Sequence, residues 1–380
     1  GSGGFPIPGN GVAISANGQR EGNQQVTLDG VIATEPRVNT AAFSPSIDAL
    51  EEFRVQTSSY SAEYGQNSGA IMQMVVKSGT NNLHGTLYEF LRNDKFAAKD
   101  YFLNFQVPAG TRLSPKNVLR RNQFGAFVSG PVYFPKLYNG KDKTFWSFNF
   151  EGRRETRETV AEAFWFPDAF RKGDFSSLLT PPLNAAGVPI RQPTIIFDPT
   201  TGEPFRDSSG RITNIIPASR INKATQDFIN KYQPLPMFVP ADPLDINARG
   251  SVPNIIRSNQ TMFRIDHNIS ANDKVFVRYI TDRSNWTNGD LNPNLNYYVS
   301  TVNVNLAAQY VKIINPTTVN EFRYGLNKAD DDTFNPRTNT GFDLDSLGLG
   351  SFRVTSGRKL TDREVGLPST IIGGHRDGGN

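Results

Sequence analysis

The sequence predicts a mainly β fold, in which about seven long antiparallel strands form part of a transmembrane β-barrel. Several segments alternate apolar and polar residues with the two-residue period of a strand. The connections between these segments alternate strictly between long and short. The mean hydropathy is −0.44, and no stretch approaches the length of about 18 apolar residues that a membrane helix needs. This excludes a helical span but not a membrane barrel, because barrel strands are only half apolar.

The first 82 residues predict a small α/β unit that precedes the long strands. Residues 24–31 form a short strand ending in an Asp-Gly pair, which is typical of a turn. Residues 44–57 begin with Ser44 as a helix N-cap, make one helical turn and then alternate like a strand. Residues 68–76 alternate in the same way. We therefore expect one helical turn among several short strands.

Long alternating segments follow this unit. The predicted strands cover residues 83–94, 122–134, 143–155, 259–270, 273–284, 301–314 and 318–329. Each has one aromatic and aliphatic face and one face of charges and amides. We assign the first kind of face to lipid, with these candidate residues: Trp146, Phe148, Phe150, Phe263, Ile265, Tyr310 and Phe322. A soluble β-sandwich would bury the same residues in its core, and alternation alone does not separate the two folds.

The connections favour the barrel. Consecutive antiparallel strands place odd-numbered connections at one end of the sheet and even-numbered ones at the other. All the long connections therefore lie at one end, as in outer-membrane barrels with short periplasmic turns and long extracellular loops. The longest covers about 156–258, and a sandwich seldom contains such a loop. It includes a helical segment at 219–232, and we take its Trp165 and Phe166 as candidate ligand-binding aromatics.

The composition argues against several function classes. The chain has no cysteine, which removes disulfides, zinc–thiolate sites and thiol catalysis. The net charge of +4 is scattered, without the basic run that tracks nucleic acid. His84, His267 and His375 lie on distant segments, and no Gly-x-Ser-x-Gly nucleophile motif is present. We expect no enzyme activity, no cofactor and no metal site, and we interpret the acidic run Asp330–Asp332 as solvated rather than as a calcium site.

Several motifs occur in an order that is typical of one family. They are "NGQREGNQQVTLDGV" (17–31), "IDALEEFRV" (47–55), "SAEYG" (61–65), "SGAIMQMVVKSGTN" (68–81), "LHGTLYEFLRND" (83–94), "RRNQFGAFVSGPV" (120–132), "KDKTFWSFNFEGRR" (141–154), "IIPASRINKATQDFINKYQPLP" (215–236), "FRIDHNISANDKVFVRY" (263–279) and "NPTTVNEFRYG" (315–325). At these residues the chain resembles TonB-dependent outer-membrane receptors, in particular the Oar-like branch with very large extracellular loops.

The resemblance implies a domain organisation. Residues 1–82 would be the C-terminal part of a plug domain, and residues 83–380 the N-terminal part of the barrel. The stretch 68–90 would then be a domain boundary rather than a hairpin, so residues 70–76 should not pair with 84–90. Barrels of this family have roughly 22 strands, so we expect this chain to be a fragment whose seven strands stay open.

The resemblance also implies a function and partners. The protein would lie in the bacterial outer membrane, in contact with lipid, and would take up an unidentified extracellular ligand with energy from the TonB–ExbB–ExbD complex. The docking box for that complex would lie outside this chain. From a different class, a surface adhesin or glycan-binding β-protein that does not transport remains the alternative.

A plug inside a barrel needs reversible polar contacts. The candidates are Arg54 in the plug and the glutamates Glu89, Glu151 and Glu321, which we place on lumen faces. Because arginine–carboxylate pairs suit such contacts, we hypothesise that Arg54 pairs with a lumen glutamate; the alternative is a solvated arginine.

Overall fold

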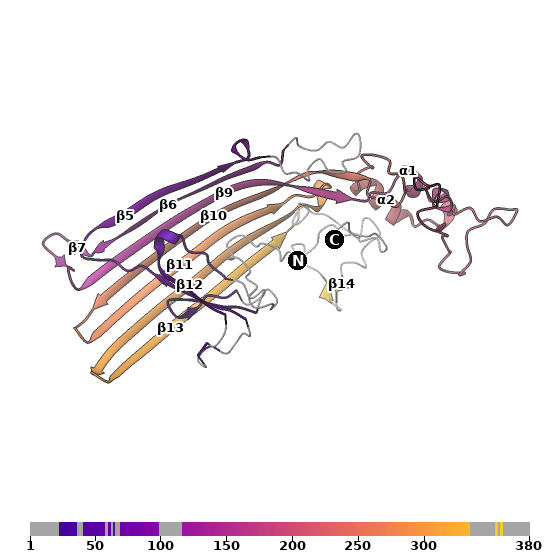
Figure 1. Cartoon of the computed structure of the whole chain (residues 1–380). Helices are drawn as coiled ribbons and strands as arrows, with labels where there is room; N and C mark the ends of the chain where they lie inside the picture. The colour runs from indigo at the N-terminus through magenta and orange to yellow at the C-terminus, as the bar shows by residue number, and fades with distance from the viewer. Residues whose placement is uncertain are drawn as a thin grey trace.

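The structure is a computed structural model of the 380-residue chain. It describes residues 23–35, 41–57, 60, 61, 64, 69–98, 116–334, 354, 355, 358 and 359. Within this part of the chain, four short strands form one sheet and seven long strands form another. We call them the small sheet and the large sheet (Figure 1).

The small sheet has the strand order β2-β1-β4-β3. Its elements are β1 (Gln25–Leu28), β2 (Val31–Ile32), the 3-10 helix η1 (Ile47–Ala49), β3 (Leu50–Gln56) and β4 (Ile71–Val76). Asp29 and Gly30 connect β1 to β2 with φ of 49° and 74°, as expected for an Asp-Gly hairpin turn. The N-cap of η1 is Ser46, not the predicted Ser44, and its hydroxyl donates to Asn149 of the large sheet instead of capping the helix.

The large sheet is a meander in which every strand pairs with its neighbour in sequence. Its strands are β5 (His84–Asn93), β6 (Leu119–Pro131), β9 (Thr144–Ala163), β10 (Ala248–Asn268), β11 (Asp273–Asn288), β12 (Tyr297–Asn315) and β13 (Thr318–Phe334). All seven predicted strands are present. Most are longer than predicted, because pairing continues past the point where apolar alternation fades, as in β10. The sheet is antiparallel and unclosed, with β5 and β13 at its edges.

The connections lie as predicted. Only residues 316–317 join β12 to β13, and 269–272 join β10 to β11. At the same end, 132–143 carry the hairpin of β7 (Tyr133–Phe134) and β8 (Tyr138–Asn139). The longest connection runs from 164 to 247, shorter than the predicted 156–258 because β9 and β10 extend into it. We call it the excursion; Figure 1 shows it reaching out beyond the opposite end of the sheet.

Short helices lie in the connections. They are η2 (Asp94–Phe96), α1 (Asp168–Arg171), η4 (Ser176–Leu179), η5 (Ala218–Arg220), α2 (Lys223–Tyr232) and η6 (Pro293–Leu295). The predicted helical segment 219–232 corresponds to η5 and α2. Asn222 caps α2 by accepting from the Thr225 N–H. Two short strands, β14 (Val354–Thr355) and β15 (Arg358–Lys359), form a separate ladder. No helix among the described residues combines the length and apolar character needed to cross a membrane.

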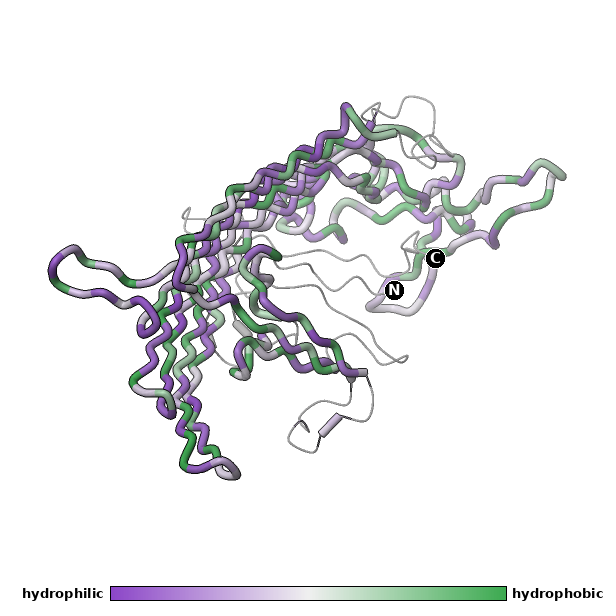
Figure 2. Tube along the Cα trace, turned by 60° about the vertical axis from the view of Figure 1, so that its left-hand side comes forward, coloured by the Kyte–Doolittle hydropathy of each residue, from purple (hydrophilic) through white to green (hydrophobic). Residues whose placement is uncertain are grey.

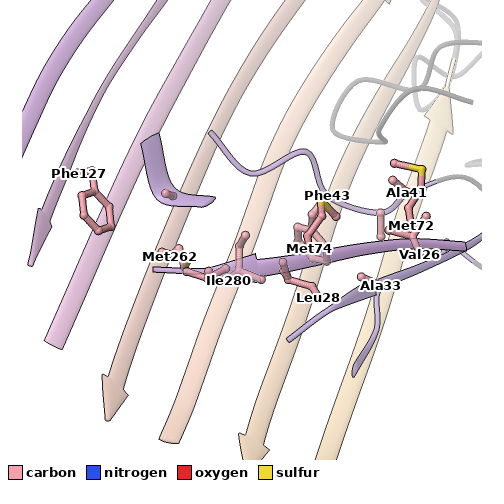
Figure 3. Close-up of a cluster of buried hydrophobic side chains, with 13 residues drawn as sticks. Val26, Leu28, Ala33, Ala41, Phe43, Met72, Met74, Phe127, Met262 and Ile280 are labelled. Atoms are coloured by element: carbon pink, nitrogen blue, oxygen red, sulfur yellow. The ribbon is translucent and has the colours of Figure 1, made fainter. Parts of the chain in front are cut away.

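The small sheet packs on one face of the large sheet, which we call the inner face (Figures 1 and 2). Buried side chains of both sheets form one apolar cluster. Met262 and Ile280 of the large sheet are fully buried in it beside Leu28 and Met74 of the small sheet (Figure 3). β4 pairs with β1 and β3, whereas β5 pairs with β6. The prediction that residues 70–76 do not pair with 84–90 is therefore confirmed.

Candidate functional site at the interface of the two sheets

A buried carboxylate of the small sheet lies at the centre of the interface. Asp29 is in the turn between β1 and β2, and its side chain is 2% exposed. Its Oδ1 accepts the backbone N–H of Val76 at 2.9 Å, which fixes the carboxylate relative to β4. The carboxylate faces the inner face of the large sheet, as its contacts with Arg264 and Arg278 show.

Two arginines of the large sheet meet this carboxylate. Arg264 Nη1 donates to Asp29 Oδ1 at 3.2 Å and to the Val76 carbonyl at 3.1 Å. Arg278 Nε lies 2.7 Å from Asp29 Oδ2, and Arg278 Nη2 donates to the Leu28 carbonyl at 3.2 Å. The Arg278 side chain is 0% exposed and that of Arg264 is 10% exposed. Ion pairs so shielded from water are screened little by salt.

Amide side chains of the large sheet bind the backbone of the small-sheet unit. Asn303 donates to the Ala42 carbonyl at 2.8 Å, Asn305 to that of Ile32 at 3.1 Å, and Asn327 to that of Thr34 at 2.9 Å. On the other side of the interface, Ser147 donates to the Lys77 carbonyl at 3.0 Å. The large sheet thus binds the backbone of the small-sheet unit, and Asp29 adds a buried ion pair.

Close backbone approach completes the fit. A Cβ added to Gly325 of β13 would lie 2.2 Å from Cγ1 of Val31. No side chain fits there unless β2 moves away, so glycine is required at this point of contact.

The predicted pairing of Arg54 is not what the structure shows. Arg54 lies exposed on β3, and none of the described contacts joins it to a glutamate. Glu151 and Glu321 do lie on the inner face: Glu151 accepts from Tyr88 at 2.8 Å, and Glu321 pairs with Arg323. Glu89 lies on the opposite face, since it alternates with Tyr88 along β5, and its predicted lumen position is wrong. The interface instead has the opposite polarity, with the carboxylate on the small sheet and the arginines on the wall.

The seven predicted lipid-facing residues share the outer face of the large sheet. The register places Trp146 beside Ile265, Phe148 beside Phe263, and Tyr310 beside Phe322. Phe263 is 43% exposed and Phe322 64% exposed, although both are large and apolar. Figure 2 shows the same alternation of hydrophobic and hydrophilic residues along the strands. That this face contacts lipid stays a prediction.

The two candidate ligand-binding aromatics lie inside the excursion. Trp165 is 5% exposed, so it is part of the core of this segment rather than of its surface. Phe166 stacks edge-on against Phe164 and Phe170, with ring centroids 5.9 Å and 6.3 Å apart. Phe166 also borders a cavity of about 260 Å³ between α1 and α2, which Arg171 lines as well. The guanidinium of Arg171 is occupied by backbone carbonyls such as that of Phe166, so its role there is structural.

Asn247 anchors the base of the excursion. Its side chain is fully buried and bridges Trp165, accepting from the backbone N–H and donating to the carbonyl, both at 2.7 Å. Asn247→Leu leaves both groups unpaired, at a cost of about 1–3 kcal/mol each. We expect faster proteolytic cleavage within residues 164–247 of the variant while the strands stay protected. Equal cleavage rates in Asn247→Leu and in the control Asn230→Leu, at an exposed position of α2, would contradict this role.

Asp198 ties two parts of the excursion together. It accepts from the Thr200 N–H and hydroxyl at 2.9 Å and 2.7 Å, and pairs with Arg220 at 2.7 Å. These hydrogen bonds, first that of the Thr200 N–H, hold the pKa of Asp198 below its ordinary value. The stabilisation is therefore present above the unfolded-state pKa and is lost as the pH falls through the folded-state pKa. We expect proteolysis of the excursion to accelerate on acidification, and Asp198→Asn to show fast cleavage at neutral pH with less dependence on pH.

The described residues contain no cluster of three or more histidine, cysteine or acidic side chains suited to a metal ion. His267 contacts Thr144 at 2.7 Å, and His375 lies outside the described residues. The acidic run Asp330–Asp332 was expected in a loop, but it lies within β13, paired with β12.

An unclosed antiparallel meander with an apolar outer face and a polar inner face is typical of a segment of an outer-membrane β-barrel protein. A model of the family described as "Outer membrane beta barrel domain" matches residues 75–380. The chain belongs to this family, and the protein is located in the bacterial outer membrane.

Individual relatives are similar over part of their length. The TonB-dependent transporter Oar of Myxococcus xanthus is 25% identical over 126 residues, which are 33% of this chain and 12% of Oar. The outer membrane transporter YddB of Escherichia coli aligns in structure with a TM-score of 0.49 and 11% identity, over 87% of this chain and 34% of YddB. The siderophore receptor PirA of Pseudomonas aeruginosa aligns with a TM-score of 0.34 and 12% identity, over 88% and 45% of the two chains. The match to Oar agrees with the resemblance to TonB-dependent receptors that the sequence motifs indicate.

Proposed function

We propose that this chain is part of a TonB-dependent outer-membrane receptor that takes up an extracellular substrate. The small sheet, within residues 1–82, is the end of a plug domain, and the large sheet from residue 83 is barrel wall. The excursion faces the cell exterior and contributes to ligand contact. The TonB–ExbB–ExbD complex supplies the energy, and the chain performs no bond-making chemistry.

The observation that supports this most is the chemistry of the interface. Burying ion pairs and amides gains little stability over apolar packing, so stability alone does not account for these polar contacts. Here one ion-paired turn and a set of amide-to-carbonyl hydrogen bonds lie beside the apolar cluster. Water can replace such hydrogen bonds when the surfaces separate, so the small sheet can leave the wall and return.

The test is whether the interface opens when the cell is energised. Ala307 is fully buried under Val31 and Phe276. In the complete receptor, Ala307→Cys should react with a thiol reagent in respiring cells grown in rich medium, and much less after a protonophore is added. Val239→Cys, on the excursion at a site that is 94% exposed, should react equally in both conditions. These 380 residues contain no cysteine, and the receptor without either substitution gives the background labelling from the rest of the protein. Energy-independent labelling of Ala307→Cys would overturn the proposal.

A further inference from the structure

The large sheet holds two arginines directly opposite each other. Arg264 of β10 and Arg278 of β11 are register partners on the inner face. Like charges in this position destabilise an antiparallel pair. The large sheet itself neutralises the charge of Arg264, because Asp266 accepts from Arg264 Nε at 2.9 Å and from Nη2 at 2.8 Å. Arg264 also lies over the ring of Phe276, 4.2 Å from its centroid.

Arg278 has no such carboxylate partner among the described residues of the large sheet. Its contact with the wall is a hydrogen bond from Nη2 to Asn305 Oδ1 at 2.7 Å. Among the described residues, the one carboxylate in ion-pair contact with Arg278 is that of Asp29, which belongs to the small sheet. The wall alone therefore carries an uncompensated positive charge at this position.

Asp29 does not satisfy all the hydrogen-bond donors of Arg278. Arg278 Nη1 is buried and makes no hydrogen bond in the described structure, and Nε approaches Asp29 Oδ2 without hydrogen-bond geometry. Asp29 Oδ1 is held by the Val76 N–H and by Arg264 Nη1, so the carboxylate does not align with the two nitrogens of Arg278. An unattached carboxylate can align with the fork of a guanidinium and form two parallel hydrogen bonds.

We propose that Arg264 and Arg278 form a binding site for a carboxylate group, which Asp29 fills while the small sheet is docked. Once the small sheet moves away, the site opens to the lumen and binds a carboxylate of a passing organic acid. Asn305, released from the Ile32 carbonyl, adds a donor, and the Phe276 ring adds a flat apolar surface. The binding of an organic acid during transport rests on the proposed function and names the substrate class of the receptor. The carboxylate site itself does not depend on transport.

The test empties the site and refills it with a free carboxylate. In the purified complete receptor, Asp29→Gly removes the carboxylate while glycine accepts the positive φ of the turn. The thermal unfolding temperature should fall, and sodium formate should raise it again along a saturating curve. Formamide, which has the same shape without the charge, should have no effect, nor should sodium chloride at equal ionic strength. The wild-type protein should not respond to formate, because Asp29 occupies its site.

A second substitution locates the effect. Asp29→Gly with Arg278→Gln should lose the response to formate. If Asp29→Gly protein does not refold in plain buffer, the refolding yield in formate against formamide gives the same comparison. Equal effects of formate, formamide and chloride, or a response that survives Arg278→Gln, would overturn the proposal. Failure of the Ala307→Cys labelling test would leave this outcome unchanged, so the two results are separable.

Discussion

Asp29→Asn in the complete receptor is expected to lose about 3–5 kcal/mol of the free energy that holds the small sheet on the wall, the usual cost of breaking a buried ion pair from one side. Asparagine also adopts positive φ, so the turn is kept and only the charge is lost. Arg264 retains Asp266, but Arg278 is left buried without a carboxylate. Release of the small sheet in a urea titration, followed by proteolysis within β1 and β4, which are mostly buried in the docked state, measures the loss.

The matched control is Glu51→Gln. Glu51 lies exposed on β3 of the same sheet, so the substitution removes the same charge from a solvated position. Its effect should be within about 0.5 kcal/mol. Adding Arg278→Gln to Asp29→Asn should cost less than the sum of the two single changes, because the pair is coupled. Additive losses would show that Asp29 and Arg278 act independently.

Phe263→Arg is expected to destabilise the folded barrel in lipid by about 2–4 kcal/mol, the cost of a cation near the bilayer midplane. Phe263 lies in the middle of the apolar rows of the outer face, with Phe148 and Tyr279 as neighbours. Folding of the complete barrel into lipid vesicles at a series of urea concentrations measures the change.

Ser300→Arg provides the comparison. Ser300 lies on the same outer face, but level with Asp332 and Asn285, where the rows are polar. An arginine there reaches the interface and a carboxylate, so the effect should be about 0–1 kcal/mol. Equal losses for Phe263→Arg and Ser300→Arg would contradict lipid contact at Phe263.

The sequence alone determined the strands and their order. A strand with one apolar face must alternate with period two, and Trp146, Phe148 and Phe150 reveal that face without any knowledge of the partner strand. The lengths of the connections then determined which ends lie together, since a two-residue link between β12 and β13 leaves only a hairpin. The turn at Asp29 was readable for the same reason, because few residue pairs other than Asp-Gly accept two successive positive φ values.

The roles of the aromatic residues in the excursion were not readable. Trp165 and Phe166 lie in an irregular, proline-rich segment, where no period indicates which side chains face inward. Asn247, which lies 82 residues from Trp165 in sequence, holds its backbone, and such a contact is decided only by the tertiary fold.

The interface required the tertiary structure. Arg264 was visible as a polar residue opposite Phe263, and Asp29 as a turn residue, but alternation assigns a residue to a face and not to a partner. Asp29 and Arg278 are 249 positions apart, and their contact depends on where the small sheet lies on the wall. Arg54 does not meet the three glutamates because it lies on the exposed edge strand β3. Glu89 lies on the outer face of the large sheet, because its position on β5 alternates with that of Tyr88. The two-residue period of a strand follows from its backbone geometry and can be recognised in the sequence. The pairing of buried charges depends instead on how the two sheets dock.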